Sequence, residues 1–268
     1  MIINIVYAFL TVTILGGALG FGLAFASRKL SVKKDERITD VEKVLPGANC
    51  GACGYAGCAS YAEAIVLEDA DIKLCVPGGA DVAKKIAEIM NVSFDIGENT
   101  KMVARVHCYG NSETTKKDFI YDGMESCNAA YMMYQGDNGC KYSCLGLGSC
   151  ITVCPVDAIT KREDGRIYVD KDVCIGCEKC VSVCPTGAMK MIPYDAAYYI
   201  ACNSKDKGAA VRKVCSVGCI GCKICEKKFP DAGFTIKNFL SEIDYSIEVN
   251  GQDEAAKACP VSCIRITD

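Results

Sequence analysis

The chain has 268 residues and a formal net charge of −3 at pH 7, and neither its charge nor its composition indicates nucleic acid as a partner. Cysteine is the outlier, with 21 residues beside one histidine and no tryptophan. Secreted disulfide proteins and metal proteins both reach this cysteine content, but close C-x-x-C runs favour metal, and a single histidine argues against Cys/His zinc sites. The sequence therefore indicates all-cysteine sites for iron–sulfur clusters or zinc, in a reducing compartment.

Residues 1–27 carry no charge and are mainly apolar. Some 24 residues of this stretch would form a helix about 36 Å long, which is enough to cross a bilayer with tilt. Basic residues then follow together at Arg28, Lys29, Lys33 and Lys34. The positive-inside rule predicts a single-pass transmembrane anchor in the cell (inner) membrane, with the N-terminus outside and the rest cytoplasmic. A cleaved signal peptide is the alternative, disfavoured because no basic residue precedes the apolar stretch.

Gly16 and Gly20 form a G-x-x-x-G pattern inside this stretch. Small residues on one helix face allow a second membrane helix to approach closely, although glycine is also simply common in membrane helices. A charged linker is expected at 28–39.

A small, mostly helical domain is predicted at 40–95. It contains the spacing C-x2-C-x4-C-x16-C, formed by Cys50, Cys53, Cys58 and Cys75. Helices are expected from Cys58 to Val66 and from Ala80 to Met90, so Cys58 would lie at a helix start, where backbone N–H groups favour negative charge. The glycine-rich segments between the cysteines favour a [4Fe–4S] cluster over the alternative, a zinc knuckle.

After a connecting region at 96–137, a two-cluster ferredoxin domain is predicted at 138–192. "CIGCEKCVSVCP" is the C-x2-C-x2-C-x3-C-P run of bacterial ferredoxins, and "CKYSCLGLGSCITVCP" is a widened copy of it. The fourth cysteine of each run ligates the other cluster. The expected ligand sets are Cys140, Cys144, Cys150 and Cys184 for one cluster, and Cys154, Cys174, Cys177 and Cys180 for the other. "GRIYVD" between the runs is expected to be a hairpin strand.

The region 193–268 is a degenerate ferredoxin-like repeat. "CIGCKICEKKFP" has Phe229 where the fourth cysteine would stand, and the later Cys-Pro pair lacks its three preceding cysteines. If the fourth cysteine of each run again ligates the other cluster, one complete set of ligands remains for one further cluster. The set is Cys219, Cys222, Cys225 and Cys259.

Five cysteines remain: Cys108, Cys127, Cys202, Cys215 and Cys263. Cys108 and Cys202 each follow an apolar run and lead a polar, lysine-rich stretch, which suggests a duplicated element. These cysteines are alternative ligands or members of a fifth cluster, or they are buried free thiols. Cys215 lies close enough to Cys219 to replace a ligand of the last cluster. The fold class expected overall is α+β, with four [4Fe–4S] clusters and possible room for five.

The order of these features resembles the B subunit of the Rnf complex, called Rsx in some bacteria. An anchor and a basic turn lead to "CGACGYAGC…CVPGG" and then to a ferredoxin domain. The resemblance is close over residues 1–92 and extends to 138–192 by motif. The widened "CKYSCLGLGSC" and the additional C-terminal unit depart from the shortest members of the family.

The resemblance implies a membrane translocase that passes electrons from reduced ferredoxin to NAD⁺ and drives Na⁺ or H⁺ across the membrane. The present chain would receive electrons from soluble ferredoxin by transient docking and relay them towards flavin- and NAD-binding subunits. No catalytic substrate site of its own is expected, since neither G-x-G-x-x-G nor a P-loop occurs. Two alternatives remain: an Rsx-type complex that reduces an iron–sulfur transcription regulator, and a metal-holding scaffold without redox turnover.

Overall fold

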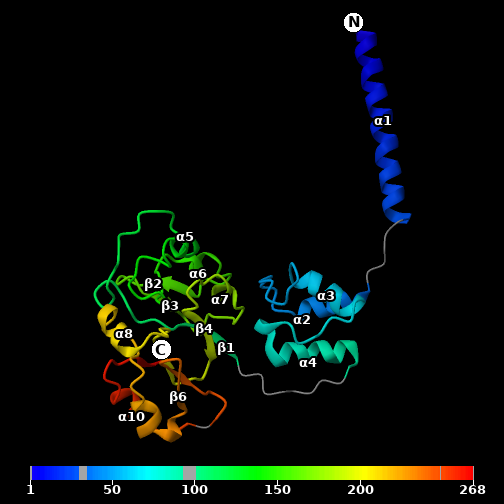
Figure 1. Cartoon of the computed structure of the whole chain (residues 1–268). Helices are drawn as coiled ribbons and strands as arrows, with labels where there is room; N and C mark the ends of the chain where they lie inside the picture. The colour runs from blue at the N-terminus through cyan, green and yellow to red at the C-terminus, as the bar shows by residue number, and fades with distance from the viewer. Residues whose placement is uncertain (1, 30–34, 93–100, 248, 268) are drawn as a thin grey trace.

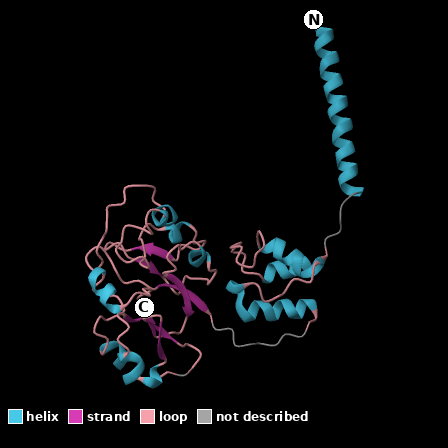
Figure 2. Cartoon of the chain, in the orientation of Figure 1, coloured by secondary structure: helices cyan, strands magenta, loops and turns pink. Residues whose placement is uncertain are grey.

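The computed structural model describes residues 2–29, 35–247 and 249–267, except for 93–100. Along the chain it contains a long helix, a small helical unit and a larger part in which short strands alternate with short helices (Figures 1 and 2). The expected α+β class is confirmed.

Helix α1 (Ile2–Lys29) stands apart from the rest of the chain in Figure 1. The described apolar side chains of α1 are exposed, among them Leu15, Leu19 and Phe21. Other side chains of α1, at positions 2–6, 8, 9, 11 and 26–29, lie outside the described residues. Within the described part of the chain, no helix qualifies by length and apolarity as a membrane span.

The helical unit packs three helices around one apolar core. Its elements are α2 (Glu36–Val44), α3 (Cys58–Leu67), the short 3₁₀ helix η1 (Val76–Gly78) and α4 (Gly79–Met90). Helix α2 starts at Asp35, whose carboxylate accepts a hydrogen bond from the backbone N–H of Arg37 at 2.9 Å. Val41, Ile65 and Ile86 are buried where the three helices meet. Both helices expected from the sequence are present within one residue of their predicted ends.

The next unit contains two short antiparallel ladders and three short helices. β1 (Met102–Val106) pairs with β4 (Met189–Pro193), and β2 (Ile159–Lys161) pairs with β3 (Ile167–Val169). The helices are α5 (Cys127–Met132), α6 (Ser149–Thr152) and α7 (Lys179–Ser182). The expected hairpin strand is β3. Strand β1 lies in the predicted connecting region but belongs to this unit, because its buried Val103 and Val106 complete the apolar core of the unit.

The C-terminal unit repeats this plan. β5 (Tyr198–Ile200) pairs with β8 (Ile264–Ile266), just as β1 pairs with β4, and β6 (Phe234–Lys237) pairs with β7 (Leu240–Ile243). Its helices are α8 (Gly208–Val214), α9 (Ile224–Lys228), the 3₁₀ helix η2 (Pro230–Ala232) and α10 (Gln252–Lys257). In each unit, a strand that precedes the cysteine run pairs with the strand that follows the last Cys-Pro pair.

Tyr109 joins the two α+β units. Its backbone N–H donates to the carbonyl of Ala201 at 3.1 Å. The guanidinium of Arg166 lies 3.9 Å from the centre of the Tyr109 ring, and that of Arg265 lies 3.8 Å from it. Because Arg166 follows the β2–β3 turn and Arg265 belongs to β8, this cation–π contact holds the units against each other.

Candidate metal centres

The first candidate centre surrounds the start of α3 and consists of Cys50, Cys53, Cys58 and Cys75 (the Cys50 group). Burial raises the pKa of Cys75, and the charges of the other three thiols raise it further. This mutual effect arises because the four side chains lie near one another. The structure therefore brings together the four cysteines that the spacing predicts for this domain.

Asn49 positions Cys58 within this group. The Asn49 Oδ1 accepts a hydrogen bond from the backbone N–H of Cys58 at 2.8 Å. The φ angle of Asn49 is 46°, in the left-handed region that asparagine adopts more readily than most residues. A Cβ atom at Gly57 would lie 2.9 Å from the same Oδ1, so a glycine is needed there for the contact.

We expect Asn49→Ala to weaken the Cys50 group by about 1–2 kcal/mol, because alanine loses the hydrogen bond and tolerates the left-handed backbone poorly. In a urea titration with an iron chelator, about four iron atoms per chain should leave at a lower urea concentration than in the parent. Asn49→Asp keeps both the acceptor and the backbone preference and should behave more like the parent. Identical release curves for Asn49→Ala and the parent would contradict this role.

The second candidate centre surrounds α7 and consists of Cys154, Cys174, Cys177 and Cys180 (the Cys154 group). Burial raises the pKa of Cys180 to about 12, and the charges of the other three thiols contribute. The Sγ of Cys174 also accepts a hydrogen bond from the backbone N–H of Ala104 in β1, at 3.5 Å. These are the four cysteines that cross-ligation predicts for one ferredoxin cluster.

The third candidate centre differs from its expected set at one position. One space is lined by Cys127, Cys144, Cys150 and Cys184 (the Cys127 group). Cys140, expected here, does not line it. The backbone N–H of Cys127 donates to the Oγ of Ser149 at 2.8 Å, which ties the start of α5 to the start of α6, where Cys150 lies. The widened spacing of the first run thus leaves room for a cysteine from outside the run.

The fourth candidate centre consists of Cys219, Cys222, Cys225 and Cys259 (the Cys219 group), which line a space together with Cys263. Hydrogen bonds from the Cys263 thiol lower the pKa of Cys219 to about 6 and that of Cys259 to about 5. The same bonds raise the pKa of Cys263. Cys263 therefore lies against two members of the group, with its sulfur 3.6 Å from that of Cys259, and its single S–H proton can be donated to one of them at a time.

Cys263 occupies the alanine position of the two C-P-x-x-A sequences that end the intact runs, at Ala158 and Ala188. We therefore expect Cys263→Ala to retain all of the iron, whereas Cys259→Ala should lose about four iron atoms per chain. Iron and protein are measured in both variants after purification without oxygen, and the iron content shows which of the two cysteines is the ligand. The reverse pattern would make Cys263 the ligand in place of Cys259.

The remaining four cysteines also come together in the structure. Cys108, Cys140, Cys202 and Cys215 (the Cys108 group) line one space where the two α+β units meet. The sequence contained one signal for this grouping, the parallel between the segments that follow Cys108 and Cys202. It did not indicate that Cys140 would leave the ferredoxin run to join them.

The donor set of these groups fits iron–sulfur clusters. All the candidate ligands are thiols, and in the Cys127, Cys219 and Cys108 groups at least four of them line one shared space. Backbone N–H groups point at many of the sulfur atoms, for example that of Gly146 at Cys144 and that of Gly221 at Cys219. Such N–H donors stabilise the negative charge of cluster sulfurs. Among the described residues, no three Cys, His, Asp or Glu side chains are arranged to hold a single metal ion.

His107, next to Cys108 in the chain, is buried, and this burial lowers the pKa of His107 to about 3. Its ring packs edge-on against Tyr199, with ring centroids 5.7 Å apart, and its backbone N–H donates to the carbonyl of Ala188. These contacts give it a packing role.

Comparison with known proteins places iron–sulfur domains in two parts of the chain. Residues 45–77 match the family described as "Putative Fe-S cluster", and residues 140–191 match the "4Fe-4S dicluster domain". The B subunit of an ion-translocating oxidoreductase complex from Methanosarcina acetivorans is 42% identical over 230 residues, covering 86% of each chain. The chain belongs to the B-subunit family of these ion-translocating oxidoreductase complexes.

Two further members of the B-subunit family carry more specific names. The B subunit of the proton-translocating ferredoxin:NAD(+) oxidoreductase complex of Clostridium ljungdahlii is 38% identical, over 98% of this chain and 92% of its own length. That of the Na(+)-translocating ferredoxin:NAD(+) oxidoreductase complex of Acetobacterium woodii is 39% identical, over 94% and 74%. Likeness to these B subunits therefore extends well beyond the two matched cluster domains, to nearly the whole chain.

Proposed function

We propose that this chain is the electron-carrying subunit of a translocase that oxidises ferredoxin and reduces NAD⁺, and that it relays single electrons from ferredoxin into the complex. The observation that carries the proposal is the likeness to the Clostridium ljungdahlii protein over 98% of the chain. The two specifically named relatives differ in their coupling ion, so either H⁺ or Na⁺ is compatible with this chain.

Within this function, each of the Cys50, Cys154, Cys127 and Cys219 groups holds one [4Fe–4S] cluster. A bound cluster supplies reversible one-electron transfer. The polypeptide contributes the thiolate ligands, the N–H donors that tune the potential, and burial that keeps water away. The chain needs no substrate pocket for this task, and the NAD and flavin sites belong to partner subunits.

The contacts between groups support a continuous relay. The pKa of Cys177 is raised first by burial, and the charge of Cys50 adds to the effect, so the Cys50 and Cys154 groups are neighbours. A Cβ atom at Gly176 would lie 3.8 Å from a methyl carbon of Val76, in the helical unit. The charge of Cys180 likewise reaches Cys150, which links the Cys154 group to the Cys127 group.

We further propose that α1 anchors the chain in the membrane, with the cluster units on the cytoplasmic side. This role is supported by the uncharged stretch 2–27 of α1, by its exposed apolar side chains such as Leu15 and Phe21, and by the basic residues from Arg28 onward. The anchor would keep the chain attached to its membrane partners while soluble ferredoxin docks transiently.

Membrane vesicles from cells that lack this chain should lose ferredoxin-dependent NAD⁺ reduction and the coupled ion uptake. Expression of the parent chain should restore both activities. Unchanged NAD⁺ reduction, together with loss of reduction of an iron–sulfur transcription regulator, would contradict the proposal and support the Rsx-type alternative. Purified chain that contains zinc and no iron would contradict any redox role.

A further inference from the structure

The Cys108 group combines cysteines from four separate segments of the chain. Cys108 follows β1, Cys202 follows β5, Cys215 follows α8, and Cys140 precedes α6. They line one common space, as the cysteines of the Cys219 group do. Unrelated buried thiols would have no reason to converge on one space from four segments of the chain.

The backbone around the Cys108 group repeats a feature of the other groups. In those groups, the N–H two residues after a cysteine donates to its sulfur; the pairs are Cys144 with Gly146, Cys177 with Lys179, Cys219 with Gly221, and Cys259 with Val261. The Cys108 group has three such pairs: Cys108 with Gly110, Cys140 with Tyr142, and Cys202 with Ser204. Free thiols do not require these donors, whereas cluster thiolates are stabilised by them.

The fourth member, Cys215, is held by the loop that follows Cys108. The Oγ1 of Thr115 lies 3.7 Å from the Sγ of Cys215 and can donate to it. The backbone N–H of Ser216 donates to the carbonyl of Thr114 at 2.9 Å, so the two segments run side by side. These contacts hold Cys215 against Thr115, in the loop that follows Cys108.

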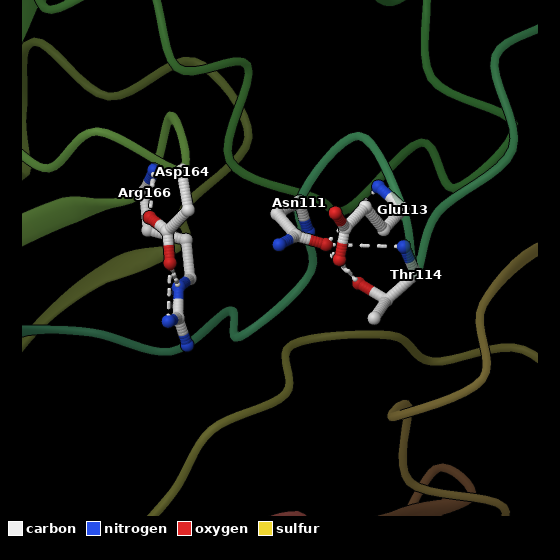
Figure 3. A network of polar contacts seen from close by, with 5 residues as sticks. All are labelled: Asn111, Glu113, Thr114, Asp164 and Arg166. Atoms are coloured by element: carbon white, nitrogen blue, oxygen red, sulfur yellow. Dashed lines mark hydrogen bonds and ion pairs between the residues drawn. The ribbon is translucent and has the colours of Figure 1, made fainter.

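Asn111 gives this loop a defined shape (Figure 3). Its side-chain Oδ1 accepts hydrogen bonds from the backbone N–H of Glu113 at 3.2 Å and of Thr114 at 3.0 Å, and from the Thr114 hydroxyl at 2.8 Å. Figure 3 also shows the nearby pair of Asp164 and Arg166, and it is this Arg166 that covers the ring of Tyr109. Asn111 therefore fixes the loop that links Cys108 to Thr115.

We infer that the Cys108 group binds a fifth [4Fe–4S] cluster, with Cys140 as its ligand and Cys127 as the ligand of the neighbouring centre. The inference deepens the proposed function and rests on it. The backbone N–H of Cys144 donates to Cys108, and that of Cys219 donates to Cys202. The fifth site thus touches the Cys127 group on one side and the Cys219 group on the other.

This position gives the site a role between the two α+β units. A cluster held there would supply one-electron transfer between the centres on its two sides, and no bond of the polypeptide would form or break. It is the contact through which the Cys219 group joins the relay.

The test uses the full-length chain, purified in detergent without oxygen, with iron, protein and reduced-state EPR measured together. The parent should contain about 20 iron atoms per chain. Cys108→Ala and Cys202→Ala should each lose about four, and the double variant should lose no more than either single one, because both act on one site. Ser112→Ala, at an exposed position in the loop that follows Cys108, is the control and should keep the parent value.

Two double variants test the exchange of Cys140 and Cys127. Cys140→Ala combined with Cys202→Ala should lose about four iron atoms, whereas Cys140→Ala combined with Cys184→Ala should lose about eight. The opposite pattern would return Cys140 to the ferredoxin cluster and overturn the inference.

The iron content of the parent separates the remaining outcomes even where a variant fails to fold. About 16 iron atoms per chain in the parent would overturn the fifth cluster and leave the proposed function intact. A parent without iron would overturn both.

Discussion

Cys180→Ala should remove about four iron atoms per chain and lower ferredoxin-dependent NAD⁺ reduction by membranes by more than about tenfold. Cys180 is 6% exposed and lies at the centre of the Cys154 group, and its charge also reaches Cys150 of the next group. The Cys154 group is the one that touches both the Cys50 and the Cys127 groups. Loss of its cluster would therefore interrupt the relay in the middle, and the neighbouring centres could not replace it.

The control for this variant lies on the same short helix. Ser182 is exposed at the end of α7, and its hydroxyl donates only to the carbonyl of Lys179, at 2.9 Å. Ser182→Ala should keep both the iron content and the NAD⁺ reduction rate. Full activity in Cys180→Ala membranes, with iron lost, would show that electrons bypass the Cys154 group.

Leu15→Arg combined with Leu19→Arg should move the chain from the membrane to the soluble fraction. One arginine at the centre of a membrane helix costs about 2.5–3.5 kcal/mol, so two together should change the partition by roughly 10⁴-fold. Both side chains are exposed on α1, and neither contributes to a cysteine group. Fractionation of cell extracts, followed by iron determination, is the measurement.

The soluble variant should retain the iron content of the parent but fail to support NAD⁺ reduction when added to membranes that lack the chain. The control, Leu15→Phe with Leu19→Phe, keeps the helix apolar and should remain in the membrane fraction. A doubly charged variant that still sediments with membranes would show that partner subunits, and not α1, hold the chain there.

Local sequence patterns predicted much of the fold. The helix expected from Cys58 to Val66 is observed as Cys58–Leu67, and the hairpin expected from "GRIYVD" is the β2–β3 pair. These elements depend on neighbouring residues, which a local pattern contains. The pairing of β1 with β4 was not predicted, because the apolar residues of β1 meet their partners only after the intervening 80 or so residues have folded around the cysteine runs.

Residue spacing likewise predicted some of the candidate sites and not others. The Cys154 and Cys50 groups follow directly from their spacing, since short loops leave few ways to bring such cysteines together. For the Cys127 group, the spacing indicated Cys140, but the structure places Cys127 there through the contact between its N–H and Ser149. The expected ligand sets remain predictions until iron is measured.

By itself, the sequence determined the chemistry of this protein: a supply of thiols, regular Cys-Pro runs and an uncharged N-terminal stretch, each a property of residues close together in the chain. Only the tertiary structure decided which four sulfurs share one space. Cys108 and Cys202 meet because β1 and β5 end beside each other where Tyr109 joins the two units. Contacts of that kind arise from the packing of distant segments, so the spacing of residues along the chain does not predict them.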